Sequence, residues 1–295
     1  MKKNLIITAT AVVLVLSVAA YALFIRPRLK AAPTPQLVVK PQTHKEAIDT
    51  LRIDSTVAEK PIELTALSEK DTKALFDTTD LSKVLSSIQP IENDKPYIEI
   101  FNGFYGPDHY RIEFYIDKVS KDASNPFRYL LSGKTRYKKN IVPFSGEINL
   151  QEFYKGKDPN IEGVENFYST IGEFKLKEDS KVKGNGTFSG KVAIDFNYNQ
   201  YDPKIKPEVG LWFYNKTASS KGGGFLLEGN WKKNALLSND QKSFIVAKDL
   251  FMIADDILPH FSIGERDVEV NPKYRHLGWD NFWENDEWWA DSPAQ

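Results

Sequence analysis

The sequence contains no cysteine, only four histidines and only two methionines. The lack of cysteine excludes disulfides, thiolate metal sites, a thiol nucleophile and the cysteine-linked lipid anchor of bacterial lipoproteins. None of the histidines has the spacing of a metal-binding motif; they are His44, His109, His260 and His276. The sequence therefore predicts no metal, no cofactor and no catalytic residue, and it favours a protein that is not an enzyme.

An excess of charge of either sign is also missing. Lysine and arginine number 39 against 40 acidic residues, a net charge of -1. Without a basic field we expect no nucleic-acid partner. Apolar residues make up 41% of the chain, and the aromatic share of 13%, with 18 Phe and 13 Tyr, favours a folded β-rich protein.

The N-terminus predicts a membrane anchor. After a short segment, residues 1–4, residues 5–25 contain no charged side chain, and a helix of this length spans ~30 Å, the thickness of the bilayer interior. We expect an uncleaved signal-anchor with the C-terminal part outside the cytoplasm, most simply in a bacterial periplasm. Cleavage after Ala22 would instead give a secreted protein. Basic residues flank both ends of the run, so charge alone does not fix the orientation.

A tether and a helical spacer are expected next. Residues 26–65 are rich in proline and lack a sustained period, which is typical of a flexible tether. In the spacer, residues 66–90, Ser68 followed by Asp71 resembles a capping box and predicts a helix. Asp80 is placed to cap a second short helix that ends before Pro90.

From Tyr97 the hydrophobic period changes to two, which predicts an antiparallel β-domain over residues 91–270. "VPFSGEINLQ" and "TFSGKVAIDFNY" each place apolar residues on one face and polar residues on the other. A first turn centred on Pro107 and Asp108 would put Glu113 opposite Asn102, and Arg111 opposite Phe104. Residues 243–270 fit either a strand followed by a helix or two strands.

Five predicted strands carry a glycine on their apolar face. Four of these glycines lie in similar four-residue motifs: "LSGK", "FSGE", "FSGK" and "LEGN". A glycine inside a strand costs packing and chain entropy, so the repetition calls for a reason. One interpretation is sharp curvature, and the other is an apolar ligand cavity. The cavity candidates are Gly103, Gly133, Gly146, Gly190, Gly229, Phe144, Phe188 and Trp231.

These glycine-bearing strands in an antiparallel meander resemble lipocalin-type barrels over residues 97–231. The resemblance implies a single antiparallel β-barrel or barrel-like meander that binds a small apolar ligand. A β-sandwich is the alternative fold. As alternative functions, the domain is an interaction or scaffolding module that binds an envelope protein, or an uncharacterised hydrolase.

Two charged segments complete the pattern. "GKTRYKK" puts Lys134, Arg136 and Lys138 on one strand face. This face either contacts anionic lipid or polysaccharide, or is simply solvated.

The C-terminal tail, residues 271–295, contains the segment "GWDNFWENDEWW". On a helix, an aromatic arc would separate from an acidic one. That arc would either pack on the domain's own core or bind a partner; its members are Trp279, Phe282, Trp283 and Trp289.

Overall fold

The computed structural model describes residues 60–90, 95–157, 167–199, 208–213, 215–234, 239–263, 270–284 and 286–290. The chain divides into two compact units, residues 1–55 and 56–295, and every described residue belongs to the second. The predicted anchor, residues 5–25, and the tether as far as residue 59 lie outside the described residues. Within the described part, no helix is both long enough and apolar enough to cross a membrane.

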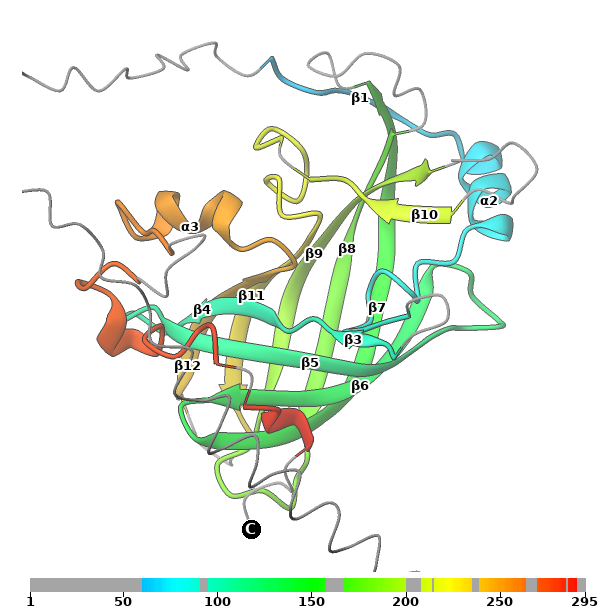
Figure 1. The fold of residues 1–295 in the computed structure, drawn as a ribbon. Coiled ribbons are helices and arrows are strands. Elements are labelled where there is room, and N and C mark those ends of the chain that lie inside the picture. The colour runs from blue at the N-terminus through cyan, green and yellow to red at the C-terminus, as the bar shows by residue number, and fades with distance from the viewer. Residues whose placement is uncertain are drawn as a thin grey trace, which may run out of the picture. The chain divides into compact units, whose positions relative to one another are not determined.

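Eight antiparallel strands pair side by side into a closed ring (Figure 1). Their bounds are β4 (Phe101–Tyr105), β5 (Tyr110–Lys121), β6 (Arg128–Tyr137), β7 (Asn140–Lys157), β8 (Phe167–Glu178), β9 (Gly186–Asn199), β11 (Phe225–Lys233) and β12 (Gln241–Ala247). Each strand pairs with the next one named, and β12 returns to pair with β4, with Phe244 opposite Tyr105. The prediction of a mainly β, antiparallel domain is confirmed.

Shorter elements extend or cover the ring. Strand β1 (Glu63–Ala66) pairs with the end of β7, β10 (Glu208–Leu211) pairs with the end of β9, and β2 (Ile88–Gln89) pairs with β3 (Tyr97–Ile98). In the part of the chain that the structure describes, the helices are α2 (Glu69–Thr78) and α3 (Phe251–Ile257), with 3-10 turns η3 (Arg275–Leu277) and η4 (Trp288–Ala290). The segment that fitted two patterns is therefore a strand, β12, followed by a helix, α3.

The spacer prediction is half right. Helix α2 begins as expected, because the Ser68 side chain accepts a hydrogen bond of 3.2 Å from the backbone N–H of Asp71. The second predicted helix is wrong. Asp80 accepts from the N–H of Ser82, but the chain makes only a turn and then enters β2. Leu81 and Leu85 are fully buried in the core, so tertiary packing overrides the weak local helical signal.

Aromatic side chains fill the ring. Phe114 and Phe188 lie 5.2 Å apart between ring centroids, and Phe244 is 5.0 Å from Phe188. The predicted inward face of β9 is confirmed, since its alternate apolar residues from Phe188 to Phe196 are buried in this cluster. A second cluster lies on the outer face, where α3 and the start of the tail pack on strand residues such as Phe104.

The recurring glycines lie where neighbouring strands approach very closely. A Cβ atom on Gly146 would lie 2.0 Å from the carbonyl oxygen of Lys175, and one on Gly133 would lie 2.0 Å from that of Tyr115. Gly190 and Gly229 face each other across β9 and β11 and show the same approach. Backbone, rather than an apolar cavity, fills the space beside these glycines. This geometry favours the curvature interpretation.

The first hairpin has the predicted register. Asn102 pairs with Glu113, and Phe104 pairs with Arg111. The turn between β4 and β5 follows Tyr105, as the sequence indicated. The polar side chains of Arg111 and Glu113 consequently share the outer face of the sheet.

Candidate functional site

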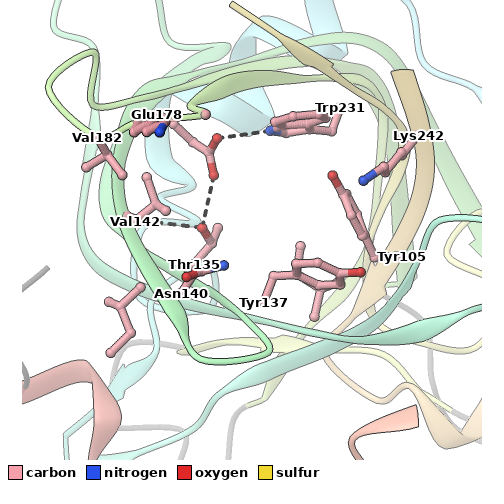
Figure 2. Close-up of a pocket in the computed structure, with 13 residues that line it drawn as sticks. Tyr105, Thr135, Tyr137, Asn140, Val142, Glu178, Val182, Trp231 and Lys242 are labelled. Carbon is pink, nitrogen blue, oxygen red and sulfur yellow. Dashed lines mark hydrogen bonds between the residues drawn. The ribbon is translucent and has the colours of Figure 1, made fainter. Parts of the chain in front are cut away.

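A recess of about 350 Å³ opens at the end of the ring where the β6–β7 and β8–β9 turns lie (Figure 2). Most of its wall comes from the ends of the strands, with the β8–β9 turn at the rim. Its lining residues are Tyr105, Ile112, Thr135, Tyr137, Asn140, Ile141, Val142, Glu178, Val182, Lys183, Gly184, Trp231 and Lys242. The recess combines aromatic rings with a carboxylate and two lysines, which suits a small ligand with both apolar and polar parts.

Glu178 is the carboxylate of this recess. It ends β8 and continues the inward phase of Phe174 and Leu176. Its Oε2 accepts hydrogen bonds of 2.9 Å from Trp231 Nε1 and 2.7 Å from the backbone N–H of Gly186, and Thr135 Oγ1 lies 3.3 Å from Oε1. Burial raises the pKa of Glu178 above its ordinary value, although these three hydrogen bonds oppose the shift.

Trp231 reaches Glu178 because a glycine lies in its path. A Cβ atom on Gly186 would lie 2.2 Å from the Trp231 indole. Gly186 belongs to β9, the strand between β8 and β11. The indole therefore crosses β9 at a position that carries no side chain, and its N–H meets a carboxylate two strands away.

Two tyrosines and a lysine complete the wall. The ring centroids of Tyr105 and Tyr137 are 4.7 Å apart, and Tyr105 lies 6.2 Å from Trp231. Burial, with Glu178 nearby, raises the pKa of Tyr105, so this phenol stays neutral at physiological pH. The Lys242 ammonium lies 5.5 Å from the Tyr105 ring and 5.8 Å from the Trp231 ring, within range of a cation–π interaction.

The residues that the sequence predicted to line one cavity lie in different places in the structure. Trp231 lines the recess, whereas the five glycines do not belong to its lining. Phe144 and Phe188 are buried in the aromatic core beneath it. The sequence reasoning missed Glu178, Tyr105, Tyr137 and Lys242. A signal existed for Glu178, because "FKLKE" places this acid at the phase of the buried Phe174 and Leu176.

The tail does not form the amphipathic helix expected from its sequence. Its described residues make turns and the two short 3-10 segments. Trp279 is fully buried against Phe104 and Phe261, while Trp283 is 46% exposed. Contacts with the sheet replace the helical pattern: Trp289 stacks on Tyr115 of β5. Trp288, which was not a member of the predicted aromatic arc, is 2% exposed.

The basic face of β6 lies against this tail. Arg136 forms ion pairs with Glu113 and with Asp286, and Lys134 Nζ donates a 2.6 Å hydrogen bond to the carbonyl oxygen of Trp289. Glu147, across the β6–β7 hairpin, lies 3.9 Å from Arg128. The sequence analysis interpreted the basic strand and the acidic tail independently. The fold places them in contact with each other.

Comparison of the chain with known proteins gives no match to a family model, to a curated protein or to a solved structure. Among the described residues, no three His, Cys, Asp or Glu side chains are grouped in a way that could hold a metal ion. The interpretation of the site therefore depends on its own geometry.

Proposed function

We propose that the β-domain binds a small amphipathic molecule in the recess at the end of the ring. The observation that carries this proposal is the pairing of a partly buried carboxylate, Glu178, with the aromatic walls of Tyr105, Tyr137 and Trp231. Aromatic rings contribute apolar contact area, and a few placed polar groups orient a ligand. A volume of about 350 Å³ accommodates a molecule of roughly one or two rings.

The polar groups indicate what the ligand carries. Glu178 accepts hydrogen bonds, so a ligand hydroxyl or amine group is its natural partner. Lys242, on the opposite side of the recess in Figure 2, donates to a ligand oxygen. We therefore propose a ring compound with one apolar face and with both a donor and an acceptor at its edge.

We also propose that the ring is a β-barrel of the lipocalin type, tethered to a membrane by residues 5–25 with the domain outside the cytoplasm. The order of its eight strands supports the first part, because an up-and-down barrel of this size holds one small ligand. Packed aromatic residues occupy its interior, so the ligand belongs at the mouth. Membrane anchoring is supported by the uncharged run, and fractionation of host cells with alkaline washing tests it.

The test of binding uses Val182, which lines the recess from the β8–β9 turn. We expect the full chain, purified from its host in mild detergent, to carry a small molecule detectable by native mass spectrometry. Val182→Trp, which fills the recess from a loop, should remove that molecule, and the matched Val182→Ala variant should keep it. Equal retention by both variants would place the ligand elsewhere. A wild-type protein that carries no small molecule would argue against the function itself.

A second candidate function is partner binding, favoured by an exposed aromatic patch. Phe251 is 44% and Trp283 is 46% exposed, and Phe282 lies between them at 5.5 and 5.0 Å from the two rings. Adjacent exposed rings are typical of interaction surfaces. Crosslinking in host membranes should recover a specific partner with wild type and lose it with Trp283→Ser. Recovery that Trp283→Ser leaves unchanged would remove this patch from consideration.

A further inference from the structure

A buried charge cluster lies on the outer face of β5 and β6, away from the recess that contains Glu178. The side chains of Arg111 and Glu113 are each 7% exposed, and that of Arg136 is 12% exposed. Glu113 accepts hydrogen bonds of 2.8 Å from Arg111 and of 2.5 and 2.8 Å from Arg136. One carboxylate thus lies between two guanidinium groups, and the cluster keeps one uncompensated positive charge.

The tail supplies the missing negative charge. Arg136 Nη1 donates to the carboxylate of Asp286, whose side chain is 38% exposed, while the other two nitrogens of Arg136 bind Glu113. The Trp288 ring lies 5.1 Å from the same guanidinium. Buried charges are stable only when paired, so Asp286 balances the cluster from outside the sheet.

A wider recess surrounds this contact. Its volume is about 790 Å³, and its lining residues are Tyr110, Arg111, Glu113, Arg136, Lys138, Lys139, Asn140, Ile141, Gly278, Asp280, Asn281, Asp286 and Trp288. Four cationic side chains face three carboxylates, and two of the carboxylates, Asp280 and Asp286, come from the tail. The strands and their turn alone therefore present four positive charges and one negative charge. Such a surface attracts anions.

We propose that this second recess binds a small molecule bearing an oxyanion, either a carboxylate or a phosphate. In the unliganded protein the Asp286 carboxylate competes with that oxyanion for the guanidinium of Arg136. The Nη1 group of Arg136, which Asp286 now holds, is the donor that becomes available, and a carboxylate or a phosphate oxygen accepts a charge-assisted hydrogen bond from it. Lys138 and Lys139 are exposed on the β6–β7 turn at the edge of the recess, where they add attraction. The ligand has to displace one partly exposed side chain, and the buried Arg111–Glu113–Arg136 cluster stays intact.

Titration calorimetry on the full chain tests this at constant ionic strength, with inorganic phosphate and succinate as separate probes and succinamide as the uncharged control. Asp286→Asn removes the competitor and should tighten oxyanion binding by about tenfold, equivalent to about 1.4 kcal/mol. The matched control is Asp256→Asn on α3, which removes the same charge from an exposed ion pair between Asp256 and Lys216. It should leave the affinity unchanged.

Two further variants locate the site. Arg136→Lys keeps the charge but loses the Nη1 donor that the oxyanion takes over from Asp286, and it should weaken binding of the preferred probe. Lys139→Gln changes an exposed residue, and it should weaken binding with no change in Tm. The probe whose affinity gains more from Asp286→Asn identifies the oxyanion. The proposal is overturned if Asp286→Asn binds no tighter than wild type, if Asp256→Asn gives the same gain, or if Lys139→Gln and Arg136→Lys both bind as wild type does.

Discussion

Trp231 donates a 2.9 Å hydrogen bond from its indole nitrogen to the carboxylate of Glu178, a residue 53 positions earlier in the chain. Glu178 ends β8 and Trp231 lies near the end of β11, and the two strands are not neighbours because β9 lies between them. This bond passes over β9 at the rim of the ring and joins an aromatic side chain to the carboxylate of the proposed ligand site. Its existence depends on the glycine in between.

We expect Gly186→Ala to break this bond. The added methyl would overlap the indole of Trp231, so the ring has to leave its position above β9. The free energy of unfolding should fall by roughly 1–3 kcal/mol, the usual range for overpacking. Chemical denaturation measures it, and the fluorescence difference between each protein and its Trp231→Phe derivative reports the indole. Ser189→Ala, an exposed change on the same strand, is the control and should alter neither quantity.

The raised pKa of Glu178 predicts how stability depends on pH. Burial is the main cause of the shift, so the folded protein binds this proton more tightly than the unfolded chain does. The associated stability is fully present below the unfolded pKa of about 4.3 and is lost as the pH rises through the higher folded value. Glu178→Gln should remove this part of the pH dependence, which begins at about pH 4 and extends upward.

The comparison for this pH experiment is Glu173→Gln, an exposed change on the same strand. Denaturation series at each pH for wild type and both variants measure the difference. If Glu173→Gln and Glu178→Gln change the profile equally, the effect comes from net charge rather than from the burial of Glu178.

Gly146→Ala decides between the two interpretations of the recurring glycines. If they only left an apolar cavity, a methyl group would be accommodated or would even add packing. The Lys175 carbonyl oxygen lies 2.0 Å from the position of that methyl, so we expect a loss of roughly 1–3 kcal/mol in the free energy of unfolding. Ser145→Ala, at the exposed neighbouring position, should be nearly neutral. If Gly146→Ala has the same free energy of unfolding as wild type, or a higher one, the result would support the cavity interpretation.

Lys121 is expected to hold α2 on the ring. Its ammonium donates to the carbonyl oxygen of Phe76, inside the last turn of the helix, and at 2.8 Å to that of Thr79. A cation at this end also interacts favourably with the helix dipole. Lys121→Met should lower the free energy of unfolding by about 1–2 kcal/mol. It should also increase amide hydrogen exchange in residues 72–79. Lys118→Met, on the same strand and exposed, should leave exchange in the helix unchanged.

Predictions from local sequence patterns were correct for features that depend on a single hairpin or a single strand. Pro107 and Asp108 placed the first turn, and the pairing of Asn102 with Glu113 followed from counting residues. The alternation in β9 identified its buried face. Helices predicted from weak patterns failed at Asp80 and in the tail, because aromatic and aliphatic side chains there find better partners on the sheet than a helix offers.

The sequence by itself determined that the domain is antiparallel and which strand faces are apolar, because a period of two is a local property of the chain. It also marked the glycine positions, since a glycine has no side chain in any fold. Only the tertiary structure decided what those features do. Pairing of β12 with β4 closes the ring, and pairing of β9 with both β8 and β11 brings Glu178 to Trp231. The close approach of neighbouring strands places backbone beside the glycines. The tertiary structure also decided that Arg136 meets Asp286, a contact between residues 150 positions apart that no periodicity encodes.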